Sequence, residues 1–337
     1  MTAPAAVEGI DAGPDRSLLP GDGGKPRRLA LSTLRDYGIV LSLGILFVVL
    51  ALTSDAFLTT TNLLNILDQS ASVGIIACAG TLVIIAGGFD LSVAAVFALS
   101  GVVAAAVANE LGAPVGLAAG VAAGTTAGAM NGALTTVGRV NPFIATLATM
   151  IMFRGAALVL TGGLLILVSD PSFTGPGRET LVGIRYPVWI FVAFAVGSSI
   201  VLTRTRFGRY VFACGGNAEA ARLSGIRVGL IRGATFAISG FAAGLAGVIS
   251  ASRVSTGQAD AGTGMELTAI AAVVIGGTSI MGGEGAIWRT VLGVLLLALI
   301  GNGFNLLGVE PTYQQMFQGA IIATAALIDV WVRRRGE

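Results

Sequence analysis

Long apolar segments fill most of the chain, and short polar stretches separate them. A helix needs about 20 predominantly apolar residues to cross the hydrocarbon core of a bilayer. By that measure the pattern predicts about ten membrane-spanning helices, and the fold class is an all-α polytopic membrane protein. The boundaries near 87–91 and 281–286 are the weakest, and each is consistent with a broken or re-entrant helix. The expected spans are 37–53, 63–87, 91–108, 114–137, 142–166, 187–203, 231–252, 264–281, 286–304 and 312–332.

Composition supports this class of protein. Hydrophobic residues make up 54% of the chain and charged residues only 11%, and the mean hydropathy is +0.86. A soluble domain normally carries about 25% charged residues. Histidine is absent, which excludes histidine-based metal sites, proton relays and catalytic triads. The two cysteines, Cys78 and Cys214, are isolated and form neither a disulfide framework nor a zinc site, so we interpret both as small packing residues, and no metal site is expected.

The charges predict which side of the membrane each end of the chain occupies. Residues 1–36 are expected to form a disordered cytoplasmic tail, because the first 30 are rich in Gly, Pro, Asp and Ala and hold no signal sequence. Lys and Arg accumulate on the cytoplasmic side of membrane proteins. An even number of spans places the C-terminus, with the arginines at 333–335, on the same side as the N-terminus. The basic residues that precede the first apolar segment are Lys25, Arg27, Arg28 and Arg35.

This topology concentrates the basic residues strongly. It places 16 of the 20 Lys and Arg residues at the cytoplasmic side. Three fall outside, Arg178, Arg185 and Arg253, and Arg154 falls within a span. An odd number of spans would not place the Lys and Arg residues on one side in this way.

The two halves of the chain, 37–170 and 187–332, carry matching short motifs in the same order. With about five spans in each half, the second half enters the membrane from the opposite side, as in the inverted repeats of transporters. The pathway of such proteins usually lies between the halves near the membrane midplane. The transmembrane domain is therefore expected over 37–337. The matches pair 52–57 with 202–207, 88–93 with 264–269, and 131–132 (followed by Gly138 and Pro142) with 302–303 (followed by Gly308 and Pro311).

One long polar interval, 204–230, interrupts the apolar segments and is expected to be a cytoplasmic loop. Asn217 is a good N-cap, Glu219 falls in the first helical turn, and Gly225 is well placed to end the helix after two turns. The pattern thus predicts a short, rigid helix outside the bilayer that docks into a groove on another protein. An ordinary solvated loop is the alternative. The residues expected to share one small-residue face are Ala218, Ala221, Arg222 and Gly225.

Several long blocks of sequence resemble ribose-type ABC sugar permeases, the membrane subunits of monosaccharide importers. The similarity runs from about residue 37 to the C-terminus and implies the type II ABC importer fold. Two departures are Ala94, where a glycine is frequent, and Cys214, where Ile or Val is usual. The blocks are GGFDLSV at 87–93, NPFIATLATMIMFRG at 141–155, TRFGRYVFACGGNAEAARLSGI at 205–226, GTGMELTAIAAVVIGGTSIMGGEG at 262–285 and the region around 302–303.

The resemblance implies that the helix near 217–225 is the coupling helix, which contacts a cytoplasmic ATPase. The chain has no phosphate-binding loop of its own, since Gly24 and Lys25 are followed by Pro26. ATP and magnesium are therefore expected on a partner subunit, with no cofactor in this chain. The glycine runs at 262–264, 276–277 and 282–285 are expected to pack or break helices. The ATPase-coupling residues are Gly215, Gly216, Asn217, Ala218, Glu219, Ala221, Arg222 and Gly225.

Polar side chains within the spans are the remaining candidates, because such residues are costly in a membrane. Asp90 and Glu266 are expected to have structural roles, accepting backbone N–H bonds at helix starts, and Arg154 to satisfy carbonyls or an acid. A sugar pathway needs neutral hydrogen-bonding groups, although polar residues also hold helices together. The candidate pathway residues are Asp68, Gln69, Asn131, Asn302, Asn305, Gln314 and Gln318.

These observations lead to one expectation and several alternatives. We expect the permease subunit of an ABC importer in the bacterial plasma membrane, transporting a ribose-, xylose- or galactose-like monosaccharide and not itself an enzyme. Its expected partners are a second permease chain forming a homodimer, two cytoplasmic ATPase subunits and a periplasmic or lipid-anchored sugar-binding protein, within the lipid bilayer. Alternatives are a nucleoside or branched-chain amino-acid permease, or a secondary transporter using acids such as Asp68 and Asp90. No nucleophile and base set supports a membrane-embedded enzyme.

Overall fold

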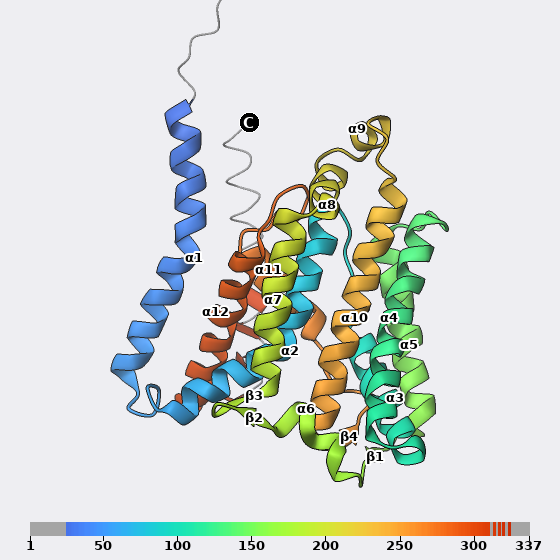
Figure 1. Ribbon diagram of the computed structural model, residues 1–337. Helices are drawn as coiled ribbons and strands as arrows, with labels where there is room; N and C mark the ends of the chain where they lie inside the picture. The colour runs from blue at the N-terminus through green and yellow to red at the C-terminus, as the bar shows by residue number, and fades with distance from the viewer. Residues whose placement is uncertain (1–24, 311–312, 315, 318, 321–322, 325–337) are drawn as a thin grey trace, which may run out of the picture.

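The computed structural model describes residues 25–310, 313–314, 316–317, 319–320 and 323–324, with side chains from Gly38 onward, and is a bundle of helices (Figure 1). Among the described residues, seven helices are long and apolar enough to cross a membrane. Most of the expected span 312–332, including Gln318, lies outside the described residues. The seven helices are α2 (Thr60–Ile85), α3 (Val93–Leu111), α4 (Ala113–Thr136), α5 (Pro142–Thr161), α7 (Tyr186–Arg204), α10 (Val228–Val254) and α12 (Ile287–Leu306).

The first helix, α1 (Lys25–Thr53), is longer than expected. The prediction of a disordered tail is wrong for residues 25–36, which are helical, while residues 1–24 lie outside the described part. Proline is tolerated in the first turn of a helix, so Pro26 does not prevent an early start. The apolar part, Gly38–Thr53, packs on α12 through a small cluster that includes Leu50, Phe57 and Leu299.

Glycines set the packing at the centre of the bundle, where α10 crosses α4. A Cβ atom added to Gly124 would lie 2.5 Å from the Cα of Gly244, and one added to Gly128 would lie 2.7 Å from the Cα of Gly240. The two helix backbones therefore touch directly, as small residues allow in membrane proteins. The same two helices pack on α3, and together they form much of the buried core.

Two segments that were expected to be weak boundaries are interrupted in the structure. Residues 86–92 connect α2 to α3 without a helix, and α11 (Met265–Ile275) is much shorter than the expected span 264–281. At a rise of about 1.5 Å per residue, such a helix covers roughly half of the hydrocarbon core. The span prediction is wrong here because Gly277, with φ 78°, ends the helix early.

Short strands and turns form one end of the bundle, which we call the strand end (Figure 1). Here β1 pairs with β4 antiparallel, with Ile166 opposite Gly257, and β2 pairs with β3. The expected span 142–166 ends early, at Thr161, because Gly162 adopts a left-handed conformation. The elements of this end are β1 (Ile166–Leu167), the 3₁₀ helix η2 (Pro171–Thr174), α6 (Gly175–Arg178), β2 (Thr180–Leu181), β3 (Ile184–Arg185) and β4 (Thr256–Gly257).

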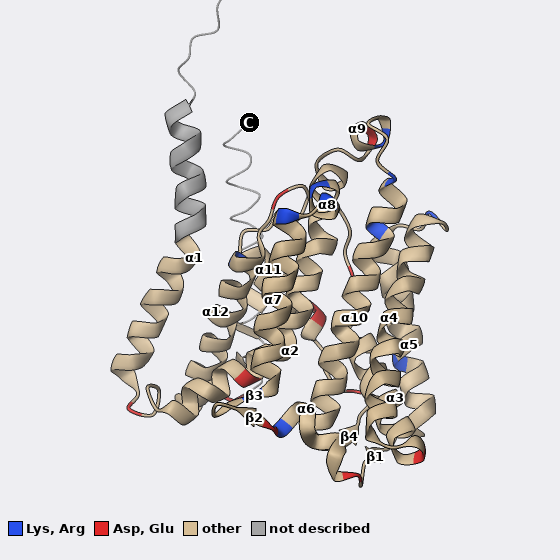
Figure 2. Cartoon of the chain, in the orientation of Figure 1, with Lys and Arg blue, Asp and Glu red and all other residues tan. Residues whose placement is uncertain are grey.

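The opposite end, which we call the α9 end, carries α8 (Arg206–Gly216) and α9 (Ala218–Leu223). Figure 2 shows that most of the described Lys and Arg residues gather at this end and few at the strand end. The polar interval is more helical than expected, because α8 buries Val211 and Cys214 against the bundle and exposes its arginines. The N-cap of α8 is Thr205, whose hydroxyl accepts a hydrogen bond from the amide of Gly208.

Candidate functional site

The short helix α9 has the local structure that its sequence predicts. The side chain of Asn217 caps it, accepting a 2.9 Å hydrogen bond from the amide of Ala220. Glu219 lies in the first turn and forms a 2.6 Å ion pair with Arg222. Both charges are mostly exposed, so this pair contributes little to stability, about 0–1 kcal/mol. The predicted N-terminus of the helix is confirmed.

Gly225 ends α9 as predicted. Its φ is 82°, a left-handed conformation that glycine adopts without strain. The amide of Gly225 donates to the carbonyl of Arg222, and the amide of Ile226 donates to the carbonyl of Ala221, each at 3.0 Å. These bonds satisfy carbonyls that a helix end otherwise leaves unpaired. The helix is thus fixed at both ends by its own residues.

The face that α9 presents differs from the expected one. Ala221 is only 5% exposed and is not displayed on the outer surface, whereas Arg222 and Gly225 are exposed. Helical periodicity groups residues on one face but does not say which face points outward. The sequence reasoning missed Leu223, which is 78% exposed. The signal was the one large apolar residue in the stretch 216–225.

The two glycines before α9 have opposite environments. Gly216 is exposed, and an added Cβ would meet no atom within 4 Å. Gly215 packs against the carbonyl oxygen of Ile85, and an added Cβ would lie 2.6 Å from the amide nitrogen of Gly283. Gly215 is therefore part of the bundle rather than of the outer surface, which corrects its expected role as a docking residue.

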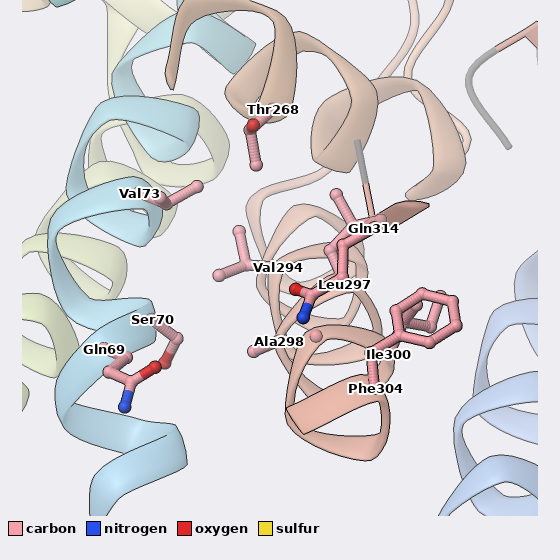
Figure 3. Close-up of a pocket in the computed structure, with 11 residues that line it drawn as sticks. Gln69, Ser70, Val73, Thr268, Val294, Leu297, Ala298, Ile300, Phe304 and Gln314 are labelled. Atoms are coloured by element: carbon pink, nitrogen blue, oxygen red, sulfur yellow. The ribbon is translucent and has the colours of Figure 1, made fainter. Parts of the chain in front are cut away.

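A second feature is a cavity of about 150 Å³ between α2, α11 and α12 (Figure 3). Figure 3 shows Gln69 and Ser70 on α2 opposite side chains of α12, with Thr268 of α11 at one end and Gln314 on the other side. Two of the seven candidate pathway residues, Gln69 and Gln314, thus line one cavity although they are far apart in sequence. Its walls combine these amides with the aliphatic and aromatic residues Val73, Val294, Leu297, Ala298, Ile300 and Phe304.

Asp68, the neighbour of Gln69, does not line this cavity. Its carboxylate is 3% exposed and forms ion pairs with Arg185 at 2.7 Å and with Arg253 at 3.0 Å. These contacts join α2 to the start of α7 and the end of α10. The structure therefore gives Asp68 a role in holding three elements together.

The asparagine candidates also bind other side chains. Asn131 is fully buried, donating to the hydroxyl of Ser92 and accepting from Thr149, both at 2.7 Å. Asn302 and Asn62 form a reciprocal amide pair between α12 and α2. Asn305 is exposed and accepts a 3.0 Å hydrogen bond from Gln314. Asn131 and Asn302 therefore hold helices together, which was the alternative to a role in the pathway.

Asp90 has the structural role expected of it. It accepts the backbone N–H of Ser92 at 3.0 Å and hydroxyls of Ser92 and Ser239 at 2.6 and 2.8 Å. Through Ser92 it is linked to Asn131, so one buried network joins the start of α3 to α4 and α10. Such networks specify one packing when every member is satisfied.

Arg154 and Glu266 lie near the interrupted segment before α11. Arg154 donates to the carbonyls of Ala259 and Ala261, as predicted, and thereby supports the non-helical chain between β4 and α11. Glu266 lies in the first turn of α11. It lines a small cavity of about 20 Å³ together with Asp90, its match in the sequence repeat. In the part of the chain that the structure describes, no group of three or more His, Cys, Asp and Glu side chains could hold a metal ion.

A family model described as branched-chain amino acid transport system / permease component matches residues 62–326. The chain is 42% identical over 306 residues to the ribose import permease protein of Escherichia coli (strain K12), covering 88% of this chain and 94% of that protein. It is 43% identical over 299 residues to the ribose import permease protein of Bacillus subtilis (strain 168), covering 88% and 93%.

A further relative is the L-arabinose transport system permease protein of Escherichia coli (strain K12), 37% identical over 295 residues, with 87% of this chain and 90% of that protein covered. No solved structure matches the chain. The family match spans more than half of the chain, and the relatives align over nearly their whole length. The chain therefore belongs to the family of branched-chain amino acid transport system permease components and is a membrane transport component, not an enzyme.

Proposed function

We propose that this chain is the membrane permease subunit of an ABC importer that takes up a monosaccharide. The observation that carries the proposal is the similarity of nearly the whole chain to ribose and L-arabinose permeases, at 37–43% identity. The family description names branched-chain amino acids, which keeps such a substrate as the second candidate. A pentose or a related sugar is favoured because the named relatives transport ribose and L-arabinose.

We propose that the cavity between α2, α11 and α12 is part of the sugar pathway. Its amides, Gln69 and Gln314, can donate to and accept from sugar hydroxyls, while the aliphatic wall suits the apolar face of a sugar ring. Neutral groups bind a sugar weakly enough to release it, which a pathway requires. Gln318 remains a proposed pathway residue, and Asn305 contributes by holding the Gln314 amide.

The proposed docking site for the ATPase is the exposed surface of α9 and its flanks, with Leu223 at its centre. Gly216, Asn217, Ala218, Glu219, Arg222 and Gly225 belong to this surface or shape it, and Ala221 supports it from the inside. Closure of the ATPases on ATP would move α9 as a rigid unit. The attached helices α8 and α10 then carry the displacement into the membrane, giving alternating access. ATP and magnesium bind to the partner.

The finer topology is also part of the proposal. About ten spans, an inverted repeat and cytoplasmic N- and C-termini are the arrangement of the type II importer fold. Support comes from the non-helical segment before α3 and from the short helix α11, whose residues Asp90 and Glu266 line one small cavity. The concentration of arginines at the α9 end supports a cytoplasmic position for that end.

The proposed assembly is a homodimer of permease chains in the bacterial inner membrane. Two cytoplasmic ATPase subunits bind at the α9 end, and a periplasmic or lipid-anchored sugar-binding protein binds at the strand end. The experiment is to reconstitute the chain in vesicles with candidate ATPase and binding subunits and to measure uptake of ribose, L-arabinose, xylose, galactose, a nucleoside and leucine. ATP-dependent uptake of one sugar supports the proposal. Accumulation of a solute by the chain alone would instead identify a secondary transporter.

Replacing Leu223 with asparagine is expected to weaken ATPase docking without unfolding the permease. An exposed apolar residue at the centre of an interface can contribute about 2 kcal/mol or more, which is roughly a 30-fold change in affinity. Uptake and co-purified ATPase should both fall more than tenfold. Arg227→Asn, an exposed change outside α9, is the control and should retain both. Normal docking in Leu223→Asn would place the ATPase elsewhere.

Filling the cavity at Gln69 is expected to block transport. Gln69→Trp should abolish sugar uptake while the complex still binds ATPase and hydrolyses ATP, because Gln69 neighbours Asp68, which pairs with Arg185 and Arg253 at the strand end, opposite α9. Asn65→Trp is the matched control, since Asn65 is exposed one turn earlier on α2 and does not line the cavity. Equal uptake by the two variants would exclude the cavity from the pathway.

A further inference from the structure

The last turn of α8 contacts two non-helical segments of the bundle, 86–92 after α2 and 276–286 after α11, through backbone atoms. Gly215 packs against the carbonyl oxygen of Ile85, the last residue of α2. The same oxygen accepts a 2.9 Å hydrogen bond from the amide of Gly283, in the segment that follows α11. A Cβ added to Gly283 would in turn lie 2.8 Å from the Cα of Gly216.

The neighbouring residues Gly282 and Gly87 lie at the same point. A Cβ added to Gly282 would lie 3.2 Å both from the carbonyl oxygen of Gly215 and from the Cα of Gly87. Gly87 belongs to the segment 86–92 that leads from α2 to Asp90 and α3. Gly87, Gly282 and Gly283 all have φ between 75° and 86°, a conformation that side chains disfavour. Glycine is therefore required here both for space and for backbone conformation.

Arg232 on α10 forms hydrogen bonds with two of these segments. Its Nε donates a 2.9 Å hydrogen bond to the carbonyl of Ala86, and an Nη donates at 3.2 Å to the carbonyl of Cys214. One half-buried guanidinium thus connects α10, the end of α2 and the end of α8. Its planar arrangement of donors suits contact with two carbonyls at once.

We infer that this contact, which we call the glycine joint (Gly87, Gly215, Gly282, Gly283 and Arg232), transmits movement of α9 to the interrupted segments of both halves. The inference rests on the proposed function. On one side, segment 86–92 leads to the Asp90 network and α3. On the other, residues 276–286 connect α11, which carries Thr268 of the cavity, to α12. Because the backbones touch, a shift of α8 cannot be absorbed by rearranging side chains.

A glycine on the preceding helix, α7, provides the matched control. Gly215→Ala adds a methyl group against Ile85 and Gly283, whereas Gly197→Ala adds it where no atom lies within 4 Å. Each variant is reconstituted with the ATPase and the binding protein, and ATPase co-purification, ATP hydrolysis and sugar uptake are measured. Gly215→Ala should retain ATPase binding and lower the sugar transported per ATP at least tenfold. Gly197→Ala should match the unmodified protein.

A second variant keeps the test decisive if Gly215→Ala fails to fold. Arg232→Gln removes the guanidinium without adding bulk and should lower the same ratio, with Arg227→Gln as the exposed control. A ratio unchanged in both Gly215→Ala and Arg232→Gln would overturn the inference. A merely structural role would reduce hydrolysis and uptake in proportion and leave the ratio intact, which also overturns it. If the unmodified complex shows no ATP-driven uptake, the proposed function itself fails, independently of the joint.

Discussion

Gly128→Val is expected to prevent stable assembly of the helix bundle. Gly128 on α4 faces the backbone of α10, where an added Cβ would lie 2.7 Å from the Cα and 2.8 Å from the amide nitrogen of Gly240, and also against the carbonyl oxygen of Phe236. Backbone atoms cannot rotate away as a side chain does, so valine forces the two helices apart. Adding bulk to a well-packed core destabilises a protein by about 1–3 kcal/mol and sometimes more. We expect Gly128→Val to lie at the upper end of that range.

The matched control uses a glycine on the outside of the bundle. Gly155→Val on α5 introduces the same side chain where no atom lies within 4 Å of an added Cβ. We expect the yield of monodisperse protein and the thermal unfolding temperature in detergent to fall sharply for Gly128→Val and little for Gly155→Val. Equal unfolding temperatures would show that α4 and α10 do not meet through their glycines.

Asp68→Asn is expected to loosen the strand end. The buried carboxylate binds two arginines, and its neutral replacement leaves Arg185 and Arg253 close together without a counter-charge. Breaking a buried ion pair costs about 3–5 kcal/mol, and because both arginines are partly exposed here we expect about 2–3 kcal/mol. The measurement is the thermal unfolding temperature in detergent, combined with hydrogen exchange of the first turn of α7.

An exposed ion pair in the same chain serves as the comparison. Glu219 and Arg222 are paired at 2.6 Å but both are more than 60% exposed, so Glu219→Gln should change stability by less than about 1 kcal/mol. A double variant, Asp68→Asn with Arg185→Gln, should recover part of the loss if the two residues interact as described. Equal effects of Asp68→Asn and Glu219→Gln would contradict the role assigned to Asp68.

The sequence predicted the features that depend on local patterns. The seven long helices lie within the expected spans or extend them by a few residues, because long apolar runs define them. The cap at Asn217 and the stop at Gly225 follow from the chemistry of neighbouring residues. The glycine runs near 277 and 282 interrupt the helix, as expected.

Features that depend on distant contacts could not be read in this way. The ion pairs of Asp68 join it to Arg185 and Arg253, which lie more than a hundred residues away in the sequence, so the local pattern gave no sign of them. Ala221 is buried rather than displayed, which helical periodicity alone does not predict. The approach of Gln69 and Gln314 to one cavity likewise depends on how α2 and α12 pack.

The pairing of β1 with β4 has a mechanical consequence. These strands belong to different proposed halves of the chain, and Asp68 links the halves again through Arg253. Any displacement of one half relative to the other must therefore either carry these contacts along or break them.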